Sequence, residues 1–178
     1  AEWGLYQRIA TAHKFPWAMT LGAIQDKNLV YQMAAKIAED CHRMGINWDF
    51  APVVDVNTNP NNPIIGNRSF GSEVDNVISS ALSYSNGLQD NNILAAIKHF
   101  PGHGDTSTDS HLDLPVVSHS MERLNTIELA PFKALMNKGI GGVMVAHLYV
   151  PSLESGKGIP ASVSKNIITG LLKDKLGY

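Results

Sequence analysis

Three short apolar segments recur along the chain about 48 residues apart, and a helical pattern lies between each segment and the next. They span residues 46–56 (INWDFAPVVDV), 93–99 and 142–147 (GVMVAH), and their β-branched and aromatic residues are typical of strands. Strands that alternate with helices pair in parallel through right-handed crossover connections. The repeat therefore predicts an α/β fold whose sheet contains three parallel strands.

Four helical patterns accompany these strands, each with apolar residues three or four positions apart. They span residues 27–44, 72–90, 126–138 and 164 onward. Asp26, Ser72 and Ser164 stand where N-cap residues are expected, and Gly45 follows the first helix as a stop signal. Pro131 is compatible with the third helix only in its first turn.

The loops that follow the strands are long and polar, whereas those that precede them are short. This asymmetry places polar side chains at one edge of the sheet, as in a (β/α)8 TIM barrel. A closed barrel needs eight strands and about 250 residues. The 178 residues of this chain therefore predict the central portion of a barrel, truncated at both ends. A small open sheet of three strands is the alternative.

The loop over residues 98–115 (KHFPGHGDTSTDSHLDLP) brings three histidines and three aspartates together directly after the second strand. Asp109 and His111 stand two positions apart within it. A carboxylate beside an imidazole raises the pKa of the ring and orients it, which suits a proton donor that works near neutral pH. The alternative is a pair of polar residues on a solvated turn.

Three further donors follow predicted strands. Lys98 and His99 end the second strand, and Arg68 lies in the loop after the first, in the run GNRSFG. Such an arrangement suits sugar hydroxyls or an anion. The structural alternatives stay open: a lysine stem packed on the core, a core histidine and a surface ion pair of the arginine. His147, at the end of the third strand, is expected to be a core histidine.

The run KHFPGHGDT, followed by DSH and LP, resembles the signature of glycoside hydrolase family 3 in its β-N-acetylglucosaminidase branch. The runs FAPVVDV, NRSFG and GVMVAHL resemble neighbouring strand ends of that family in the same order. The resemblance extends over essentially all of residues 1–178. It implies a (β/α)8 barrel that removes terminal β-linked N-acetylglucosamine in an exo-acting manner and with retention of configuration.

The resemblance also implies catalytic roles. His111 matches the general acid/base of this branch, and Asp109 matches its supporting aspartate. The nucleophilic aspartate of the family is expected beyond Tyr178, so the chain alone is predicted to be unable to complete a double displacement. The other acidic residues near the expected face lie outside the nucleophile's motif: Asp55, Asp105 and Asp113.

The sugar-binding positions of the family match Arg8, in the run ExGxxxR, together with Arg68, Lys98 and His99. The implied partner is a glycan that ends in N-acetylglucosamine, most of all a peptidoglycan fragment from a bacterial cell wall, with chitin oligosaccharides as a second source. No cofactor and no metal ion is expected. The open edges of a partial barrel would pair with the rest of the same barrel or with a second copy of the chain.

Composition excludes several classes of function. The formal charge of −2 and the absence of a basic run give no support for nucleic-acid binding. No apolar run approaches the roughly 20 residues of a membrane span. Cys41 is the single cysteine, so we expect a buried thiol and no internal disulfide. The compartment is not readable: the bacterial periplasm or cell envelope and the cytoplasm are both compatible.

Two other functions remain as alternatives. The first is a non-catalytic carbohydrate-binding domain derived from the enzyme, which would keep the sugar-binding donors but tolerate loss of His111. The second is a metal-dependent hydrolase, although the spacing of its ligands matches no known zinc pattern. Those zinc ligands would be His99, His103, Asp105, Asp109 and His111.

Overall fold

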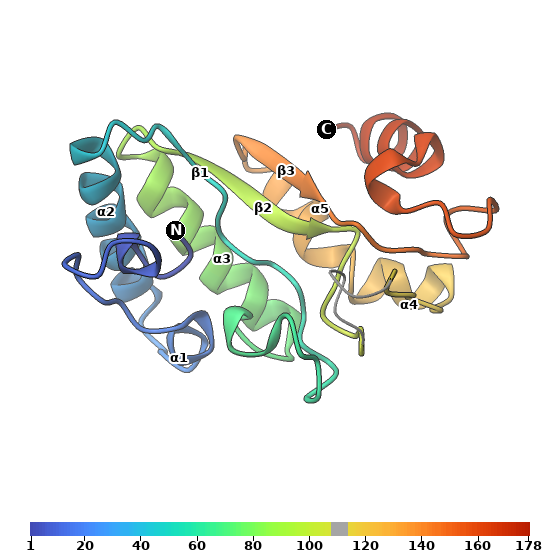
Figure 1. Ribbon diagram of the computed structural model, residues 1–178, viewed down its shortest axis with the longest axis horizontal. Coiled ribbons are helices and arrows are strands. Elements are labelled where there is room, and N and C mark those ends of the chain that lie inside the picture. The colour runs from blue at the N-terminus through green and yellow to red at the C-terminus, as the bar shows by residue number, and fades with distance from the viewer. Residues whose placement is uncertain (108–113) are drawn as a thin grey trace.

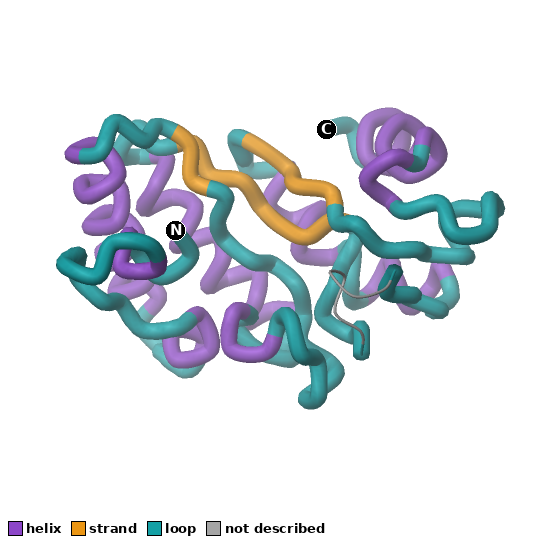
Figure 2. Tube along the Cα trace, viewed as in Figure 1, coloured by secondary structure: helices purple, strands orange, loops and turns teal. Residues whose placement is uncertain are grey.

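The computed structural model describes residues 1–107 and 114–178. Its sheet has three parallel strands in the order β1 (Trp48–Asp49), β2 (Leu94–Phe100) and β3 (Gly142–Val145). Figures 1 and 2 show the strands side by side. The prediction of a parallel α/β fold is therefore confirmed.

The first strand is shorter than predicted. Residues 46–56 were expected to form one strand, but regular pairing covers only Trp48–Asp49, and a single further bridge joins Val53 to Lys98. Pro52 lies between the two stretches and has no N–H to donate, so the ladder is interrupted there. The chain nevertheless continues beside β2, because the amide of Val54 donates to the carbonyl of Lys98 at 2.7 Å.

Helices cover one face of the sheet. α3 packs on β2 and on both α2 and α5. In Figure 1, α3 and α5 lie behind the strands, and α2 stands beside α3 at the left. Ala95 and Ile97 of β2 are fully buried in the shared core. Cys41 is buried there too, as expected, and burial raises the pKa of its thiol to about 11. The helices are α1 (Ala18–Gly22), α2 (Lys27–Arg43), α3 (Val74–Gln89), α4 (Met121–Thr126), α5 (Ala130–Met136) and the π-helical η4 (Asn166–Lys175).

The predicted caps and ends are partly correct. Asp26 caps α2 by accepting from the amide of Asn28, as expected. Ser72 does not cap α3. The N-cap residue of this helix is Glu73, whose side chain makes no capping hydrogen bond. Ser164 accepts from the amide of Ile167 although η4 begins two residues after it.

The region predicted as one helix over residues 126–138 forms two helices, α4 and α5. Ser120 caps α4 by accepting from the amide of Arg123. α4 ends at Thr126, with Ile127 as its C-cap residue. α5 begins at Ala130, and Pro131 lies in its first turn. Proline is tolerated in that turn because the first amides of a helix have no partner within it. The position expected for Pro131 within a helix was therefore correct, but the helix start was not.

The other face of the sheet is open within the described residues. Trp48 and Phe50 are 46% and 49% exposed, and with Ala96, Val143 and Met144 they line a hollow of about 200 Å³. In a (β/α)8 barrel the helices cover the outer face of the sheet and side chains fill its inner face. The molecule has the organisation of part of such a barrel. Among the helices of the described residues, none is long and apolar enough to cross a membrane.

Candidate active site

The carboxyl end of β2 carries the first candidate residues. Lys98 lies on the same face of the strand as Leu94 and Ala96, because alternate side chains of a strand share a face. That is the open face of the sheet. Lys98 is also near the carboxyl end of β2, so it lies at the carboxyl edge of the sheet. His99 follows, and the amide of Gly102 donates to the carbonyl of His99 at 2.8 Å, which closes a turn. Polar groups at this edge are the usual catalytic groups of barrel enzymes.

Asp55 orients the loop after β2. Its side chain is fully buried, and it accepts from Nδ1 of His99 at 2.7 Å and from the amide of His103 at 2.7 Å. The amide of His99 donates to both carboxylate oxygens at 3.2 Å. One carboxylate on the segment after β1 therefore holds both the ring of His99 and the start of the loop that follows it.

The pKa of Asp55 reflects these contacts. Burial alone would raise its pKa, but the attraction of His99, the hydrogen bond from its ring and the nearby His103 outweigh burial and lower the pKa. Asp55 is therefore a carboxylate at neutral pH, and a buried carboxylate of this kind depends on all its donors.

His99 in turn contacts Arg68. Nη2 of Arg68 lies 3.3 Å from Nε2 of His99. A guanidinium can only donate, so Nε2 of His99 accepts. The proton of the neutral imidazole therefore lies on Nδ1, and this N–H donates a hydrogen bond to Asp55. Asp55 therefore selects the tautomer of His99 as well as its orientation.

Glu2 binds the two cations of the site. Its carboxylate accepts from Nε and Nη2 of Arg68 at 2.8 and 2.7 Å, and its Oε1 lies 2.6 Å from Nζ of Lys98. Burial raises the pKa of Glu2, but the hydrogen bonds and positive charges of Arg68 and Lys98 more than compensate and lower it from 4.5 to about 2. We call Glu2, Asp55, Arg68, Lys98 and His99 the strand-end cluster.

Two glycines let the neighbouring loop approach this cluster. A Cβ on Gly104 would lie 1.9 Å from the carbonyl oxygen of Val56, and a Cβ on Gly102, whose φ is +129°, would lie 2.7 Å from the Cβ of Glu128. Neither position has room for a side chain. Gly104 is therefore needed for the loop to pack against the segment after β1, and Gly102 is needed for it to pack against Glu128.

His103, between these glycines, is a buried second-layer histidine. Its Nδ1 lies 2.6 Å from Oγ1 of Thr106, and Asn62 donates to its carbonyl at 2.8 Å. Burial, which outweighs the attraction of Asp55, lowers the pKa of His103. Its Nε2 is buried and has no hydrogen-bond partner within residues 1–107 and 114–178.

The structure brings together three of the predicted site residues: Arg68, Lys98 and His99. It does not bring Arg8 to them. Arg8 is exposed, donates to the carbonyl of Gln7, and lines a hollow with Ile46, which precedes β1 at the opposite edge of the sheet. His111 and Asp109 lie outside the described residues.

Other histidines differ from expectation or lie elsewhere. His147 was expected in the core, but it lies two residues beyond β3, is exposed, and contacts Ser162 through Nδ1 at 2.9 Å. The zinc alternative drew its ligands from His99, His103, Asp105, Asp109 and His111, of which Asp109 and His111 lie outside the described residues. In the part of the chain that the structure describes, no three His, Cys, Asp or Glu side chains are grouped to hold a metal ion.

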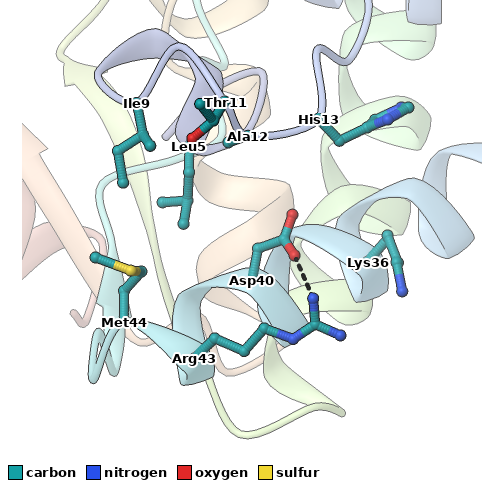
Figure 3. Close-up of a pocket in the computed structure, with 9 residues that line it drawn as sticks. All are labelled: Leu5, Ile9, Thr11, Ala12, His13, Lys36, Asp40, Arg43 and Met44. Atoms are coloured by element: carbon teal, nitrogen blue, oxygen red, sulfur yellow. Dashed lines mark ion pairs between the residues drawn. The ribbon is translucent and has the colours of Figure 1, made fainter.

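One hollow among the described residues lies away from the strand-end cluster. Its volume is about 360 Å³, and Figure 3 shows it between the N-terminal segment, with Leu5 and Ile9, and the side chains of α2. Asp40 and Arg43 of α2 form an ion pair across its floor. None of the predicted site residues within the described ranges lines it, so its size gives it no catalytic significance.

Sequence reasoning gave no binding role to Glu2 or Asp55. A signal existed for Asp55, which lies at the carboxyl end of the strand predicted over residues 46–56, where barrel enzymes place functional groups. No local signal could pair Glu2 with Arg68, because 66 residues separate them.

Comparison with known proteins agrees with this geometry. The family model for the glycosyl hydrolase family 3 N-terminal domain matches residues 1–178. β-Hexosaminidase A of Pseudoalteromonas piscicida is 38% identical over 180 residues, which cover 94% of this chain and 30% of that protein.

Solved structures extend the likeness to three dimensions. A family 3 β-N-acetylglucosaminidase from a Paenibacillus species shares 46% identity with a TM-score of 0.88, covering 90% of this chain and 30% of that one. NagZ from Neisseria gonorrhoeae, solved with N-trifluoroacetyl-D-glucosamine, shares 32% identity with a TM-score of 0.91, covering 100% of this chain and 54% of that one. The chain thus spans about a third to a half of the length of these relatives.

Proposed function

Because this chain belongs to glycosyl hydrolase family 3, through its N-terminal domain, we propose that it forms part of the active site of a retaining, exo-acting β-N-acetylglucosaminidase. The observation that carries the proposal is the convergence of Arg68, Lys98 and His99 at the carboxyl edge of the sheet. Arg68 and Lys98 offer donors in a fixed arrangement, and the ring of His99, bonded to Asp55 and Arg68, holds the arginine in place. Sites built from such donors discriminate strongly between sugars, since an analogue that lacks a hydroxyl or amide leaves buried donors unpaired.

Glu2 and Asp55 are the positioning residues of this proposal. Glu2 holds Arg68 through a bidentate contact and keeps Lys98 beside it, while Asp55 sets the ring of His99. Donors that are oriented before the sugar arrives lose less conformational entropy on binding. We infer that the two carboxylates prepare Arg68 and Lys98, with His99 beside them, for the hydroxyls and the N-acetyl group of a terminal sugar.

The proposed chemistry is a double displacement. His111 donates a proton to the glycosidic oxygen while a nucleophilic aspartate attacks the anomeric carbon, so the bond to the leaving alcohol breaks and a glycosyl-enzyme forms. His111 then takes a proton from water, whose oxygen attacks the same carbon and releases the aspartate. Two inversions retain the configuration. In this proposal Asp109 supports His111, and the aspartate lies outside residues 1–178.

The substrate follows from the relatives. The names of the relatives specify hexosaminidase or N-acetylglucosaminidase activity, and the Neisseria gonorrhoeae protein was solved with an N-acylated glucosamine. We therefore propose terminal β-linked N-acetylglucosamine as the sugar released here. Peptidoglycan fragments are the proposed natural source, in keeping with the bacterial relatives.

The test uses the protein expressed from its whole gene. Hydrolysis of an aryl β-N-acetylglucosaminide is measured for the wild type, for His111→Ala and for Arg68→Ala, with the aryl β-glucoside as the control sugar. General acid/base catalysis contributes about 10²- to 10⁴-fold to the rate, so kcat of His111→Ala should be lower than that of the wild type by a factor of about 10² to 10⁴. Arg68→Ala should raise KM or lower kcat/KM. His42→Ala, an exposed histidine on α2, is the matched control and should retain wild-type rates.

Added azide gives a second readout. A variant that lacks only the acid/base residue still forms the glycosyl-enzyme from an activated aryl sugar, so azide should accelerate His111→Ala and yield the β-glycosyl azide. Folded wild-type protein that cleaves neither sugar but binds N-acetylglucosamine would contradict the proposal and favour the non-catalytic binding domain.

A further inference from the structure

A second group of polar side chains lies beside the strand-end cluster and has no role in the proposed chemistry. Asp105 accepts from Oγ1 of Thr58 at 3.0 Å and contacts Nε2 of His119. Nη2 of Arg123 lies 3.9 Å from the same carboxylate and 3.3 Å from Oγ1 of Thr58. Arg123 also binds the buried Glu128 at 3.2 Å. We call Thr58, Asp105, His119, Arg123 and Glu128 the Asp105 cluster.

The position of this cluster in the chain is its main feature. Asp105 precedes the Asp109–His111 pair, and His119 follows it, so the contact between Asp105 and His119 joins residues that are 14 positions apart. Every member of the cluster belongs to the described residues. Asp105 and His119 stand on either side of the candidate acid/base in the sequence.

Each end of this stretch has a second anchor. Upstream, Asn59 donates to the carbonyl of Thr106 at 3.1 Å, which ties the loop after β2 to the loop after β1. Downstream, the amide of Val117 donates to the carbonyl of Tyr149 at 2.9 Å, beyond β3. These anchors attach the two ends to the segments that follow β1 and β3. The contact between Asp105 and His119 joins one end to the other.

We propose that the Asp105–His119 contact positions the general acid/base, because it holds together the two ends of the stretch in which His111 lies. The inference rests on the proposed function. Closing a loop with a contact removes part of the freedom of the residues between its ends. A misplacement of about 1 Å can cost about 100-fold in rate, so loss of this contact should change catalysis more than stability.

The choice of substrate separates positioning of an acid from general damage. A nitrophenolate departs with little protonation, whereas an alkyl or sugar alkoxide needs a proton from the acid as the bond breaks. The ratio of kcat/KM for the aryl N-acetylglucosaminide to kcat/KM for the alkyl one therefore reports on the acid. This ratio is independent of the fraction of folded enzyme, because both rates come from one preparation.

The variants are chosen to break and to keep the contact. His119→Ala removes it, whereas the amide nitrogen of His119→Gln can still donate to Asp105 from nearly the same place. Asp105→Asn weakens it from the other side, and His42→Ala is the matched control on an exposed histidine. His119→Ala should raise the aryl-to-alkyl ratio about 10-fold or more. His119→Gln should recover most of that loss, and the double variant should be no worse than the more impaired single variant.

The outcomes are distinguishable. A wild-type enzyme that cleaves N-acetylglucosaminides, with an unchanged ratio in His119→Ala, would overturn this inference and leave the proposed function standing. A wild type that cleaves neither N-acetylglucosaminide would overturn the proposed function and this inference with it. An increased ratio in His119→Ala that His119→Gln reverses would support both.

Discussion

The strand-end cluster and the Asp105 cluster use the same chemical groups in different surroundings. In each, one aspartate contacts a histidine ring, and an arginine lies nearby. The side chain of Asp55 is fully buried, whereas that of Asp105 is 24% exposed. We therefore expect that burial, rather than the identity of the partners, decides how much each of these charged contacts contributes to stability.

The physical reason is the cost of desolvation. A buried carboxylate that loses a partner has no water to replace it, and breaking such a pair costs about 3–5 kcal/mol. A partly exposed carboxylate regains water, so its contacts contribute about 1 kcal/mol or less. The strand-end cluster should therefore support the fold as well as the site, and the Asp105 cluster should act mainly through geometry. The predictions below test this difference.

The largest effect is expected for Asp55→Asn. The neutral amide keeps the shape of the side chain, but only one of its two ends can accept from His99 and His103, and a buried donor loses its partner. We expect a loss of about 3–5 kcal/mol in the free energy of unfolding, measured by urea titration. Asp90→Asn, at an exposed aspartate that accepts from Tyr31, is the control and should change stability by less than about 0.5 kcal/mol. Equal changes in the two variants would contradict the comparison.

The next effect is a dependence of stability on acid. The pKa of Glu2 is lowered from 4.5 to about 2 in the folded protein. A lowered pKa means that the unfolded chain takes up the proton first, so the contribution is complete above pH 4.5 and is lost as pH falls towards 2. It amounts to about 3 kcal/mol.

This dependence can be measured by urea titrations at several pH values between 6 and 2.5. Asp55 contributes in the same direction, because its pKa is lowered as well. Glu2→Gln should be less stable than the wild type at pH 6, and the gap should narrow as the pH falls. A constant gap across this range would show that Glu2 is not held as a carboxylate by Arg68 and Lys98.

The two clusters also differ in how far the sequence reveals them. The strands at residues 93–99 and 142–147 were predicted to within two residues at each end, because their apolar runs are bounded by polar turns. The edge at which Arg68, Lys98 and His99 meet followed from the parallel alternation alone. The strand predicted over residues 46–56 is interrupted at Pro52, because proline has no N–H to donate to the neighbouring strand.

Contacts between distant residues were beyond prediction. Glu2 meets Arg68 across 66 residues, and Asp105 meets His119 across 14, and neither pair lies on one helix face or one strand ladder. Such contacts depend on how the loops are folded against each other, which periodicity does not encode. The close approach that Gly102 and Gly104 permit also depends on which segments pack against the loop, so it could not be predicted from the sequence.

A smaller effect on stability is expected for the Asp105 cluster. Asp105 and His119 are each about one-quarter exposed, so His119→Ala should lower the free energy of unfolding by about 1 kcal/mol or less. A double-mutant cycle with Asp105→Asn should give a coupling energy of about 0.5–1 kcal/mol. Destabilisation as large as that of Asp55→Asn would show that this cluster supports the fold and would remove the distinction between the two.

The smallest effect is expected at the ion pair between Lys36 and Glu39 on α2. Its two side chains are each 53% exposed, so both charges remain hydrated when the pair separates. Glu39→Gln should leave the Tm unchanged within error, and added salt should make no difference between the variant and the wild type. Arg68→Lys is the informative counterpart, because an ammonium cannot form the bidentate contact with Glu2 and should lower the Tm. If Glu39→Gln lowered the Tm as much as Arg68→Lys, then contact alone, and not burial, would determine how much charged groups contribute to stability in this protein.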